Sequence, residues 1–220
     1  MVDISGGDSV NYSALSFFHS VNGEPAGNVK FIALVEGTPF FRDYWMSALV
    51  TLPGTRKFAN IQVKLNLLDN NIHFTDVKGN EMVTSAVVHE LYLVDTVEAG
   101  SYSLISSNVL SPGATSKTRW FLVLEKGTAT LLKEVSKKIK ETKPYGSATT
   151  EQRIETGYRY YILSNNNLFQ IKKLRSITEA LPDRRKELKQ FISHNHLQEK
   201  NEQHWISVIN YYNQLAGQSK

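Results

Sequence analysis

The chain has 220 residues, with 25 lysines and arginines against 21 aspartates and glutamates, and therefore carries a formal net charge of +4. A mild charge that is spread along a chain does not by itself indicate nucleic-acid binding. The absence of cysteine excludes disulfides, thiolate metal sites, a cysteine nucleophile and thiol redox chemistry. At this length one large domain, alone or with a small appendage, buries enough surface to fold without a covalent staple.

The sequence contains no run that is long enough for a membrane-spanning helix, which needs about 20 apolar residues. The longest apolar runs, 31–35 and 120–124, have five residues each. Residues 1–12 are polar and contain glycine, and we expect them to form a flexible leader. They show neither the basic nor the apolar region of a signal peptide.

Up to residue 173, short apolar runs alternate with turn residues, which predicts roughly ten to twelve antiparallel strands joined by short turns. The clearest period of two lies in 60–67, where the apolar residues share one face: Ile61, Val63, Leu65 and Leu67. The expected strands are 14–21, 29–35, 48–52, 60–67, 72–76, 82–88, 89–94, 101–105, 120–124, 128–135, 157–164 and 168–172. No βαβ unit or internal repeat is visible.

The strongest strand signal is a hairpin around Gly127. Bulky residues fill 120–124, and apolar and β-branched residues fill 128–135, which suits a half-buried pleated surface. Gly127 can adopt a positive φ at little steric cost, as tight hairpin turns require. The alternative is a helix over 130–139, supported by three apolar residues at i, i+4 spacing, Leu131, Val135 and Ile139. The glycine turn favours the strand, and we place this hairpin in the centre of the sheet.

After residue 173 the pattern becomes helical. Ser176 and Glu179 have the spacing of a capping box, which predicts a short helix that ends at Leu181, before Pro182. Because proline cannot continue a helix, a second helix should start after it.

Two longer helices are expected to follow. Asp183 can cap one that runs to about His194, and Asn201 can cap another that ends at Gly217. The last helix carries an apolar stripe at helical spacing: Trp205, Ile206, Val208, Ile209 and Tyr212.

The predicted fold class is therefore α+β and mainly antiparallel β. A large β-meander sheet, open or curved into a half barrel, is followed by a three-helix C-terminal segment. We expect a flexible leader at 1–12, an antiparallel β domain at 13–173 and a helical segment at 174–217 that packs on the sheet.

The most aromatic stretch is the best candidate for ligand binding, with Phe40, Phe41, Tyr44 and Trp45 as the candidate residues. Tyrosine and tryptophan combine apolar area with a polar tip, which suits a pocket wall or a platform for a sugar. Aromatic residues in a β-rich chain are more often part of the core, and this reading stays open.

Three histidines near the end of the chain, His194, His196 and His204, form the nearest approach to a metal cluster. Residues two apart on a helix point away from each other, and a histidine at a helix end also interacts well with the helix dipole. We therefore predict no metal site and no cofactor, and keep this trio as the weaker alternative.

Lysines and arginines recur at 133–143 and again at 172–200, where contact with phosphate or lipid headgroups is conceivable. Solvated surfaces with neighbouring ion pairs are the favoured reading. The sequence holds no phosphate-binding loop, nucleophile elbow or zinc-protease motif, so it predicts no catalytic residue. We favour a protein that is not an enzyme, without excluding one, because catalytic groups need only meet in space.

Three stretches carry a resemblance to known proteins. They are Gly-Thr-Pro-Phe-Phe at 37–41 with Trp45, the hairpin at 120–132, and the end of the chain from 161 to 213, which includes Leu-Pro-Asp-Arg-Arg-Lys-Glu-Leu at 181–188. With these features the chain resembles a group of uncharacterised, β-rich exported proteins of the Bacteroidota. Such proteins normally carry a signal peptide or lipoprotein leader. The resemblance implies an envelope location, periplasmic or associated with the outer membrane, and it implies no activity and no functional residue.

The leading functional hypothesis is a non-catalytic envelope protein, a binding module or accessory subunit for a hydrophobic ligand or a protein partner. One alternative is a hydrolase-type enzyme with a site near 40–45, which would bring Asp43, His73 or His89 together with a second acid. The other is a binder of anionic surfaces that uses the basic C-terminal segment. Nucleic acid is not favoured as a partner.

Overall fold

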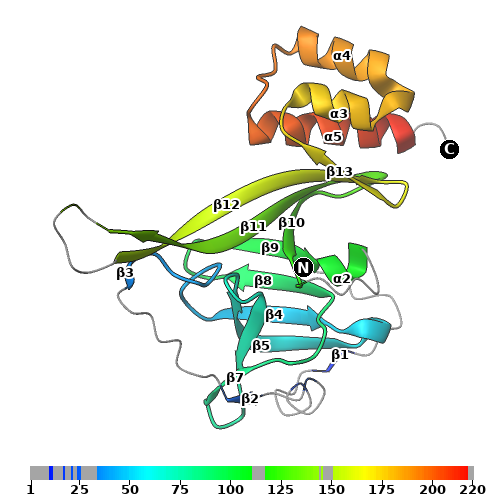
Figure 1. Ribbon diagram of the computed structural model, residues 1–220. Helices are drawn as coiled ribbons and strands as arrows, with labels where there is room; N and C mark the ends of the chain where they lie inside the picture. The colour runs from blue at the N-terminus through cyan, green and yellow to red at the C-terminus, as the bar shows by residue number, and fades with distance from the viewer. Residues whose placement is uncertain are drawn as a thin grey trace. The chain divides into compact units, whose positions relative to one another are not determined.

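The computed structural model describes residues 10–11, 17, 21, 24–25, 34–110, 117–143, 145 and 151–217. They form an α+β fold in which a ten-strand antiparallel meander sheet, which is not closed, is followed by C-terminal helices (Figure 1). This confirms the predicted fold class. Most of the expected strand at 14–21, most of the one at 29–35 and most of the expected leader lie outside the described residues. Phe17 and Val21, the two described residues of 14–21, are helical rather than extended, so they do not support a strand there.

The ten strands of the meander follow one another along the chain. They are β4 (Met46–Thr51), β5 (Lys57–Asn66), β6 (Asn71–Thr75), β7 (Glu81–Val83), β8 (Glu90–Asp95), β9 (Gly100–Ser106), β10 (Trp120–Glu125), β11 (Ala129–Thr142), β12 (Glu151–Ser164) and β13 (Asn167–Ile171). Three short strands precede them, β1 (Val10–Asn11), β2 (Glu24–Pro25) and β3 (Leu34–Glu36), and two short helical turns interrupt them, η1 (Pro53–Thr55) and α2 (Ser107–Leu110).

The favoured strand at 128–135 is confirmed and extends to Thr142, so the alternative helix over 130–139 is wrong. The strand expected at 82–88 is confined to β7, which ends at Val83.

The chain divides into two compact units. The N-terminal unit consists of 1–120 and 135–157, and the C-terminal unit of 121–134 and 158–220, so that β11 and β12 contribute residues to both. Each unit has its own buried residues and is described by itself below.

In the N-terminal unit the strand order is β9-β8-β4-β5-β6-β7-β2, with β1 beside β5 and β3 beside β12. Alternation along the strands sends every second side chain into the core. The predicted face of β5 is buried as expected: Ile61 is 1% exposed, Val63 0%, Leu65 0% and Leu67 1%. Phe17 packs against Phe58 and Phe74 and adds an aromatic group to this core.

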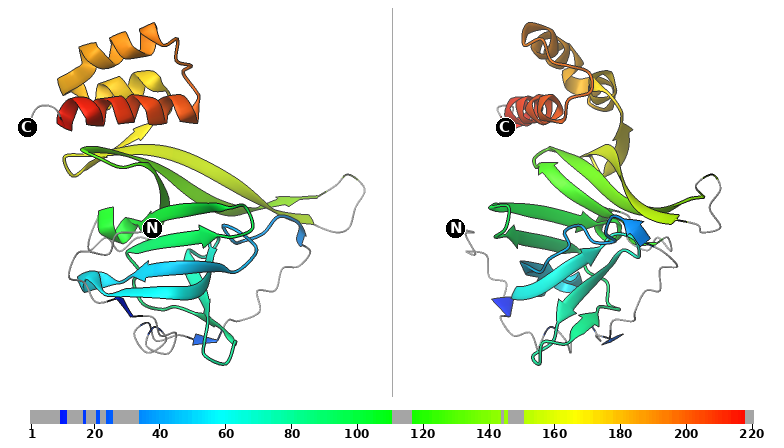
Figure 2. Two further views of the ribbon diagram at one scale, coloured as in Figure 1. Left: turned by 180° about the vertical axis from the view of Figure 1, so that it is seen from behind. Right: turned by 90° about the vertical axis from the view of Figure 1, so that its left-hand side faces the viewer.

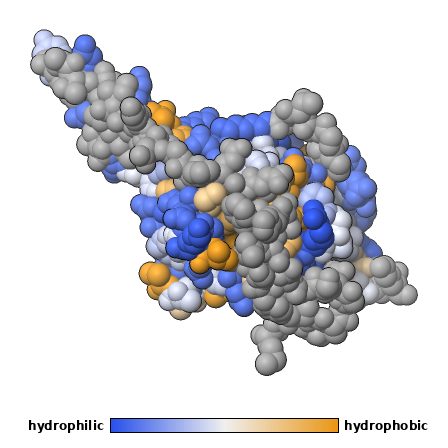
Figure 3. Space-filling model, turned by 90° about the horizontal axis from the view of Figure 1, so that it is seen from below, coloured by the Kyte–Doolittle hydropathy of each residue, from blue (hydrophilic) through white to orange (hydrophobic). Residues whose placement is uncertain are grey.

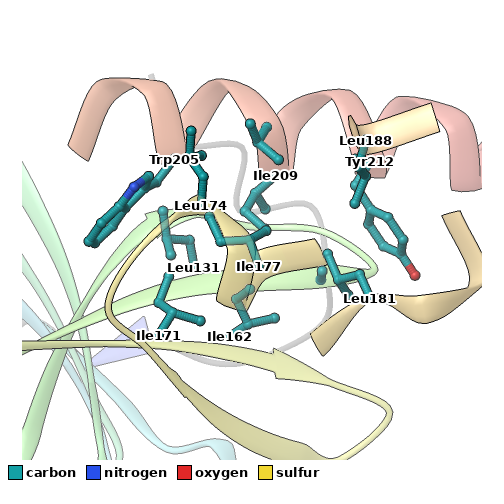
Figure 4. Packing of buried hydrophobic residues seen from close by; sticks show 12 residues of the cluster. Leu131, Ile162, Ile171, Leu174, Ile177, Leu181, Leu188, Trp205, Ile209 and Tyr212 are labelled. Carbon is teal, nitrogen blue, oxygen red and sulfur yellow. The ribbon is translucent and has the colours of Figure 1, made fainter. Parts of the chain in front are cut away.

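In the C-terminal unit, β10 to β13 lie beside the helices α3 (Leu174–Ala180), α4 (Arg185–His194) and α5 (Glu202–Gly217), with the turn η2 (Pro182–Arg184) before α4. The helices pack on one side of β13 and the neighbouring strands (Figure 2). Figure 4 shows how the apolar side chains of strands and helices meet. The buried cluster is Ala129, Leu131, Ile162, Ile171, Leu174, Ile177, Leu181, Leu188, Trp205, Val208, Ile209 and Tyr212.

The start of α3 corrects the predicted capping box. The helix begins three residues earlier, at Leu174 after Lys173 as its N-cap, so Ser176 is the third helical residue. Its hydroxyl accepts the N–H of Lys173 at 3.3 Å and donates to the Lys173 carbonyl at 2.8 Å. Glu179 instead pairs with Arg175 at 2.9 Å, one turn before it. The carboxylate of Glu179, which the sequence pattern assigned to the N-terminal cap of α3, is therefore bound in a local ion pair with Arg175.

The two later helix starts differ from each other. Asp183 does not cap α4, because its carboxylate accepts the hydroxyl of Tyr212 at 3.1 Å. Asn201 does cap α5, since its Oδ1 accepts the N–H of His204 at 3.2 Å, and the helix ends at Gly217 as predicted.

The hairpin turn contains glycine for a reason that the sequence does not reveal. Gly127 is not among the described glycines with positive φ. A Cβ at this position would lie 2.3 Å from Nδ2 of Asn213 on α5. The Asn213 amide accepts the N–H of Ala129 at 2.8 Å and donates to the Ala129 carbonyl at 2.9 Å. Glycine therefore leaves room for a side chain that joins α5 to the first residue of β11.

We expect Gly127→Ala to lower the free energy of unfolding by about 1–3 kcal/mol, because the added methyl group displaces the Asn213 amide from its two hydrogen bonds. Chemical denaturation measures this change. In an Asn213→Ala background the same substitution should cost clearly less, because the amide is no longer present. Equal costs in both backgrounds would contradict this account of the glycine.

Trp205 should be the most sensitive core position in the last helix. Its side chain is 5% exposed, its Nε1 donates to the Glu199 carbonyl at 3.0 Å, and its ring meets that of Tyr160 edge to face. Trp205→Ala is expected to cost about 3–5 kcal/mol in unfolding free energy. Lys189→Ala, at an exposed position of α4, is the control and should change little. Wild-type stability of Trp205→Ala would mean that Trp205 does not anchor α5.

Candidate functional site

The predicted aromatic segment extends the contact between β4 and β5. Phe40 forms an antiparallel bridge with Asn66, and the N–H of Phe41 donates to the Leu65 carbonyl at 2.7 Å. Alternation then places Phe40 and Phe41 on opposite faces of the sheet. All four candidate aromatics of this segment are half-buried. The segment is therefore divided between two separate sets of contacts.

On one face, Phe40 and Trp45 enclose a lysine. The Lys64 Nζ lies 4.4 Å from the ring centre of Phe40 and 4.9 Å from that of Trp45. The ring of Phe40 also meets the imidazole of His73 edge to face, at 5.1 Å between centroids. These contacts stabilise the ammonium group against the negative faces of the two rings.

On the other face, Arg42 organises the contacts. Its guanidinium donates to Glu98 at 2.6 Å and to the hydroxyl of Tyr102 at 2.7 Å, and it lies 5.4 Å from the ring centre of Phe41. Tyr102 packs edge to face against Phe41, at 5.0 Å between centroids. Arginine and aromatic rings therefore form one packed group at this end of the sheet.

Tyr44 completes this group through a carboxylate. Its hydroxyl donates to Oδ2 of Asp95 at 2.7 Å. Burial, followed by this hydrogen bond, raises the pKa of Tyr44 to about 12. Burial alone would raise the pKa of Asp95, but the N–H groups of Glu98 and Val97, the Tyr44 hydroxyl and the Arg42 charge together lower it. The carboxylate of Asp95 thus supports the native state in its ionised form.

The ligand-binding role of Phe40, Phe41, Tyr44 and Trp45 stays a prediction. The contacts described above occur within the unit and involve no ligand. The hydrolase alternative stays a prediction. The side chain of Asp43 is exposed, whereas His73 pairs with an acidic residue, Glu81, at 2.7 Å on neighbouring strands.

The three C-terminal histidines do not form a metal site. His194 is the last residue of α4, His196 has a positive φ after it, and Nδ1 of His204 accepts the N–H of Gln198 at 2.8 Å. Within the described part of the chain, no group of three or more histidines and acidic residues is placed to hold a metal ion.

The C-terminal unit contains a groove that the sequence did not single out. It has a volume of about 460 Å³ and lies where β12 and β13 meet the start of α5. Its lining combines aromatic, basic and acidic side chains: Tyr158, Arg159, Tyr160, Gln170, Ile171, Lys172, Lys200, Glu202 and Trp205.

Strand register places the tyrosines of this groove. Tyr160 pairs with Ile171 at the end of the β12–β13 ladder, and Tyr158 lies two residues earlier on the same face of β12. Because β13 ends at Ile171, Tyr158 has no partner across this ladder and is 55% exposed. The ring of Tyr160 packs at 4.8 Å against that of Trp205, in the first turn of α5.

A hydrogen-bonded network holds the groove wall in place. Oε2 of Glu202 accepts the hydroxyl of Tyr160 at 2.6 Å and pairs with Nζ of Lys133 at 2.6 Å. The Lys133 ammonium lies 4.5 Å from the ring centre of Tyr158. Burial, together with the hydrogen bond to Glu202, raises the pKa of Tyr160 well above its ordinary value. The phenol is therefore a neutral, fixed donor at all physiological pH values.

The remaining charge of the groove is positive. Glu202 already contacts Lys133, and Arg159 pairs with the buried Glu134 at 3.1 Å. Lys172 and Lys200 are both exposed, and no ion pair is found for either among the residues that the structure describes. The N-terminal end of α5 adds the positive end of a helix dipole. The groove thus offers an aromatic surface beside two free ammonium groups.

The sequence contained a weak signal for this groove. Tyrosines at 158, 160 and 161 stand out in one predicted strand, but the same pattern is common at half-buried positions. Lys172 and Lys200 are 28 positions apart by sequence number and became neighbours of one groove through folding.

Comparison with models of protein families, with curated proteins and with solved structures finds no match for this chain. Among the helices that the structure describes, none is long and apolar enough to cross a membrane.

The cluster around Asp95 predicts an acid-dependent stability. Because the pKa of Asp95 is lower in the folded protein than the unfolded value of about 3.9, its contribution is complete above that value and is lost as the pH falls through the folded pKa. Asp95→Asn should therefore lower the melting temperature at pH 7, and the difference from the wild type should shrink as the pH falls toward about 3.

Thermal unfolding followed by circular dichroism between about pH 7 and pH 3 measures this difference. Asp43→Asn, at an exposed position, is the matched control and should follow the wild type throughout. A melting-temperature difference that stays constant over this pH range would contradict the role given to the Asp95 carboxylate.

Proposed function

We propose that this protein is a non-catalytic binding module that holds an acidic, aromatic-containing segment of a protein partner in the groove of its C-terminal unit. The observation that carries the proposal is the exposed ring of Tyr158 beside the unpaired Lys172 and Lys200 in that groove. An anionic segment with an apolar side chain satisfies both features at once.

The groove wall is organised before any partner arrives. Tyr160 is held by a hydrogen bond to Glu202 and by edge-to-face packing with Trp205, and Lys133 is held by the same carboxylate. Side chains that are already fixed lose little conformational freedom on binding, so more of the interaction energy remains for affinity. Tyrosine and tryptophan are also the residues that most often dominate binding energy at protein interfaces.

Charge supports an acidic partner. Neither lysine of the groove forms an ion pair among the described residues, the groove's own carboxylate, Glu202, is paired with Lys133, and the start of α5 adds positive potential. Attraction between such groups and a carboxylate-bearing segment speeds association and selects against basic partners. A purely hydrophobic ligand would leave these ammonium groups unused, so we favour the protein partner over a hydrophobic small molecule.

The strand that borders the groove offers a second means of contact. β13 stands at the end of the strand order, with no further strand beside it in the described part of the chain. Phe169 is 40% exposed at its middle, and Gln170 is also exposed. An edge strand presents N–H and C=O groups with which an extended segment can pair. A partner segment that enters the groove in extended form can therefore also align with β13.

One further part of the proposal rests on the sequence alone. The envelope location follows from the resemblance described above. On the coloured part of the face in Figure 3, apolar residues lie among hydrophilic ones. Large exposed apolar side chains of the described residues include Val77, Val87, Val97 and Phe169, which come from different elements and loops.

Reversing the two free charges should abolish most of this binding. The probe is a capped hexapeptide that alternates glutamate and phenylalanine, with a peptide that alternates lysine and phenylalanine as its charge control. We expect the Lys172→Glu/Lys200→Glu variant to bind the acidic peptide at least about ten-fold more weakly than the wild type, because attraction becomes repulsion. Fluorescence anisotropy of a labelled peptide gives the dissociation constants.

The matched control is Lys186→Glu/Lys189→Glu, which makes the same charge change on exposed positions of α4, away from the groove lining. This control should retain affinity close to the wild type, and affinity should fall as salt is added. Equal loss in both double variants would show a general charge effect and contradict the groove. Competition by anionic vesicles, at equal strength in both variants, would instead favour the binder of anionic surfaces.

A further inference from the structure

The backbone hydrogen bonds of the β12–β13 hairpin follow from its turn. Asn165 and Asn166 form the turn, and both have a positive φ, at 50° and 60°. A two-residue turn of this kind joins the residues that flank it, here Ser164 and Asn167, as a hydrogen-bonded pair. Because hydrogen-bonded pairs recur at every second position of an antiparallel ladder, Tyr160 and Ile171 form the last such pair.

The main chain of Tyr158 therefore faces a side of β12 on which β13 has already ended. Its N–H and carbonyl point to the same side as those of Tyr160, two residues away. Among the strands that the structure describes, none pairs with Tyr158 on this side: β13 ends at Ile171, and β3 meets β12 only at Gln152 and Arg153. Tyr158 thus lies at a locally open edge of β12.

After β13 the chain turns away from this edge. The N–H groups of Lys172 and Lys173 both donate to the hydroxyl of Ser176, at 3.3 Å each, and α3 follows. The groove lies where a continued β13 would have run, since its lining includes Tyr158, Ile171 and Lys172. The groove therefore leaves space for a strand that β13 itself does not supply.

We infer that the acidic, aromatic-containing segment binds in this groove as an added strand that pairs with the main chain of Tyr158. The inference rests on the function proposed above and specifies how the segment is held. In an antiparallel orientation one residue of the segment exchanges two hydrogen bonds with Tyr158, and the segment continues the line of β13.

The side chains around Tyr158 specify what the added strand carries. Its residue opposite Tyr158 lies on the same face as the tyrosine ring, where an aromatic cross-strand pair is stabilising. The Tyr158 ring is 55% exposed and is therefore accessible for this pair. Lys172 follows the last residue of β13 directly, so it stands at the end of the added strand, where a carboxylate next to the aromatic residue can pair with it. An aromatic residue flanked by acidic residues fits this arrangement.

Amide hydrogen exchange in the full chain, followed by ¹H–¹⁵N NMR, tests the pairing. The probe is the capped hexapeptide that alternates glutamate and phenylalanine, added to saturation. We expect the N–H of Tyr158 to exchange at least about ten-fold more slowly with the peptide, because it then donates to the added strand. The N–H of Arg159 points to the other side of β12, toward β11, and its exchange rate should not change.

Two variants separate the main-chain contact from the ring. Tyr158→Ala removes the ring and keeps the N–H, whereas Tyr158→Pro removes both. Proline is compatible with a strand where the N–H faces an open edge. We expect the proline variant to bind the peptide about five-fold more weakly than the alanine variant, as for the loss of one hydrogen bond, when measured by fluorescence anisotropy. Equal affinities would contradict the main-chain pairing.

The exchange measurement on the wild type decides the inference even if the proline variant fails to fold. Peptide binding without slower exchange at Tyr158 would overturn the added strand and leave the groove as the binding site. Slower exchange at Leu168 and Gln170 instead would also overturn it and assign the pairing to the outer edge of β13, since these residues alternate with those bonded to β12. Absence of peptide binding in the anisotropy measurement would overturn the proposed function and this inference together.

Discussion

The C-terminal unit depends on the burial of one apolar face of its strands under its helices. Leu131, Ile162 and Ile171 lie on three consecutive strands, and each is 2% exposed or less. Strands with one apolar face cannot remain folded in water by themselves, because that face must be removed from solvent. Trp205 and Ile209 of α5 cover it, and α3 and α4 complete the cluster (Figure 4). Strands and helices in this unit therefore stabilise each other.

The same packing also creates the groove. Trp205 belongs both to the buried cluster and to the lining of the groove, and Tyr160 links it to the Glu202 network. Because the face of β12 continues past the last residue of β13, Tyr158 emerges at the boundary of the core. In the N-terminal unit, Trp120 likewise has two places: it is among the largest buried side chains, and it borders a pocket with polar side chains in its lining. The groove is thus continuous with the core that supports it.

Local patterns predicted much of the fold because strand alternation and helix periodicity are properties of neighbouring residues. The buried face of β5 and the Asn201 cap of α5 followed directly from such patterns. Two predictions were wrong because another residue bound the group that was assigned to a helix cap. Glu179 pairs with Arg175, one helical turn away, rather than with Ser176, and the carboxylate of Asp183 accepts the hydroxyl of Tyr212 from α5. The candidate groove escaped prediction because its lining comes from β12, β13 and α5, which are separated in sequence.

The sequence by itself determined the fold class, the order of strands and helices, and which faces are apolar, because each is written in the spacing of side chains along the chain. Tertiary structure decided what those side chains meet. It gave Gly127 a role as space for the Asn213 amide, divided the aromatic segment between Lys64 on one face and Arg42 on the other, and left the Trp120 N–H without a partner. Contacts between residues that are distant in sequence depend on how helices and strands pack, and the local spacing of apolar residues does not specify this packing.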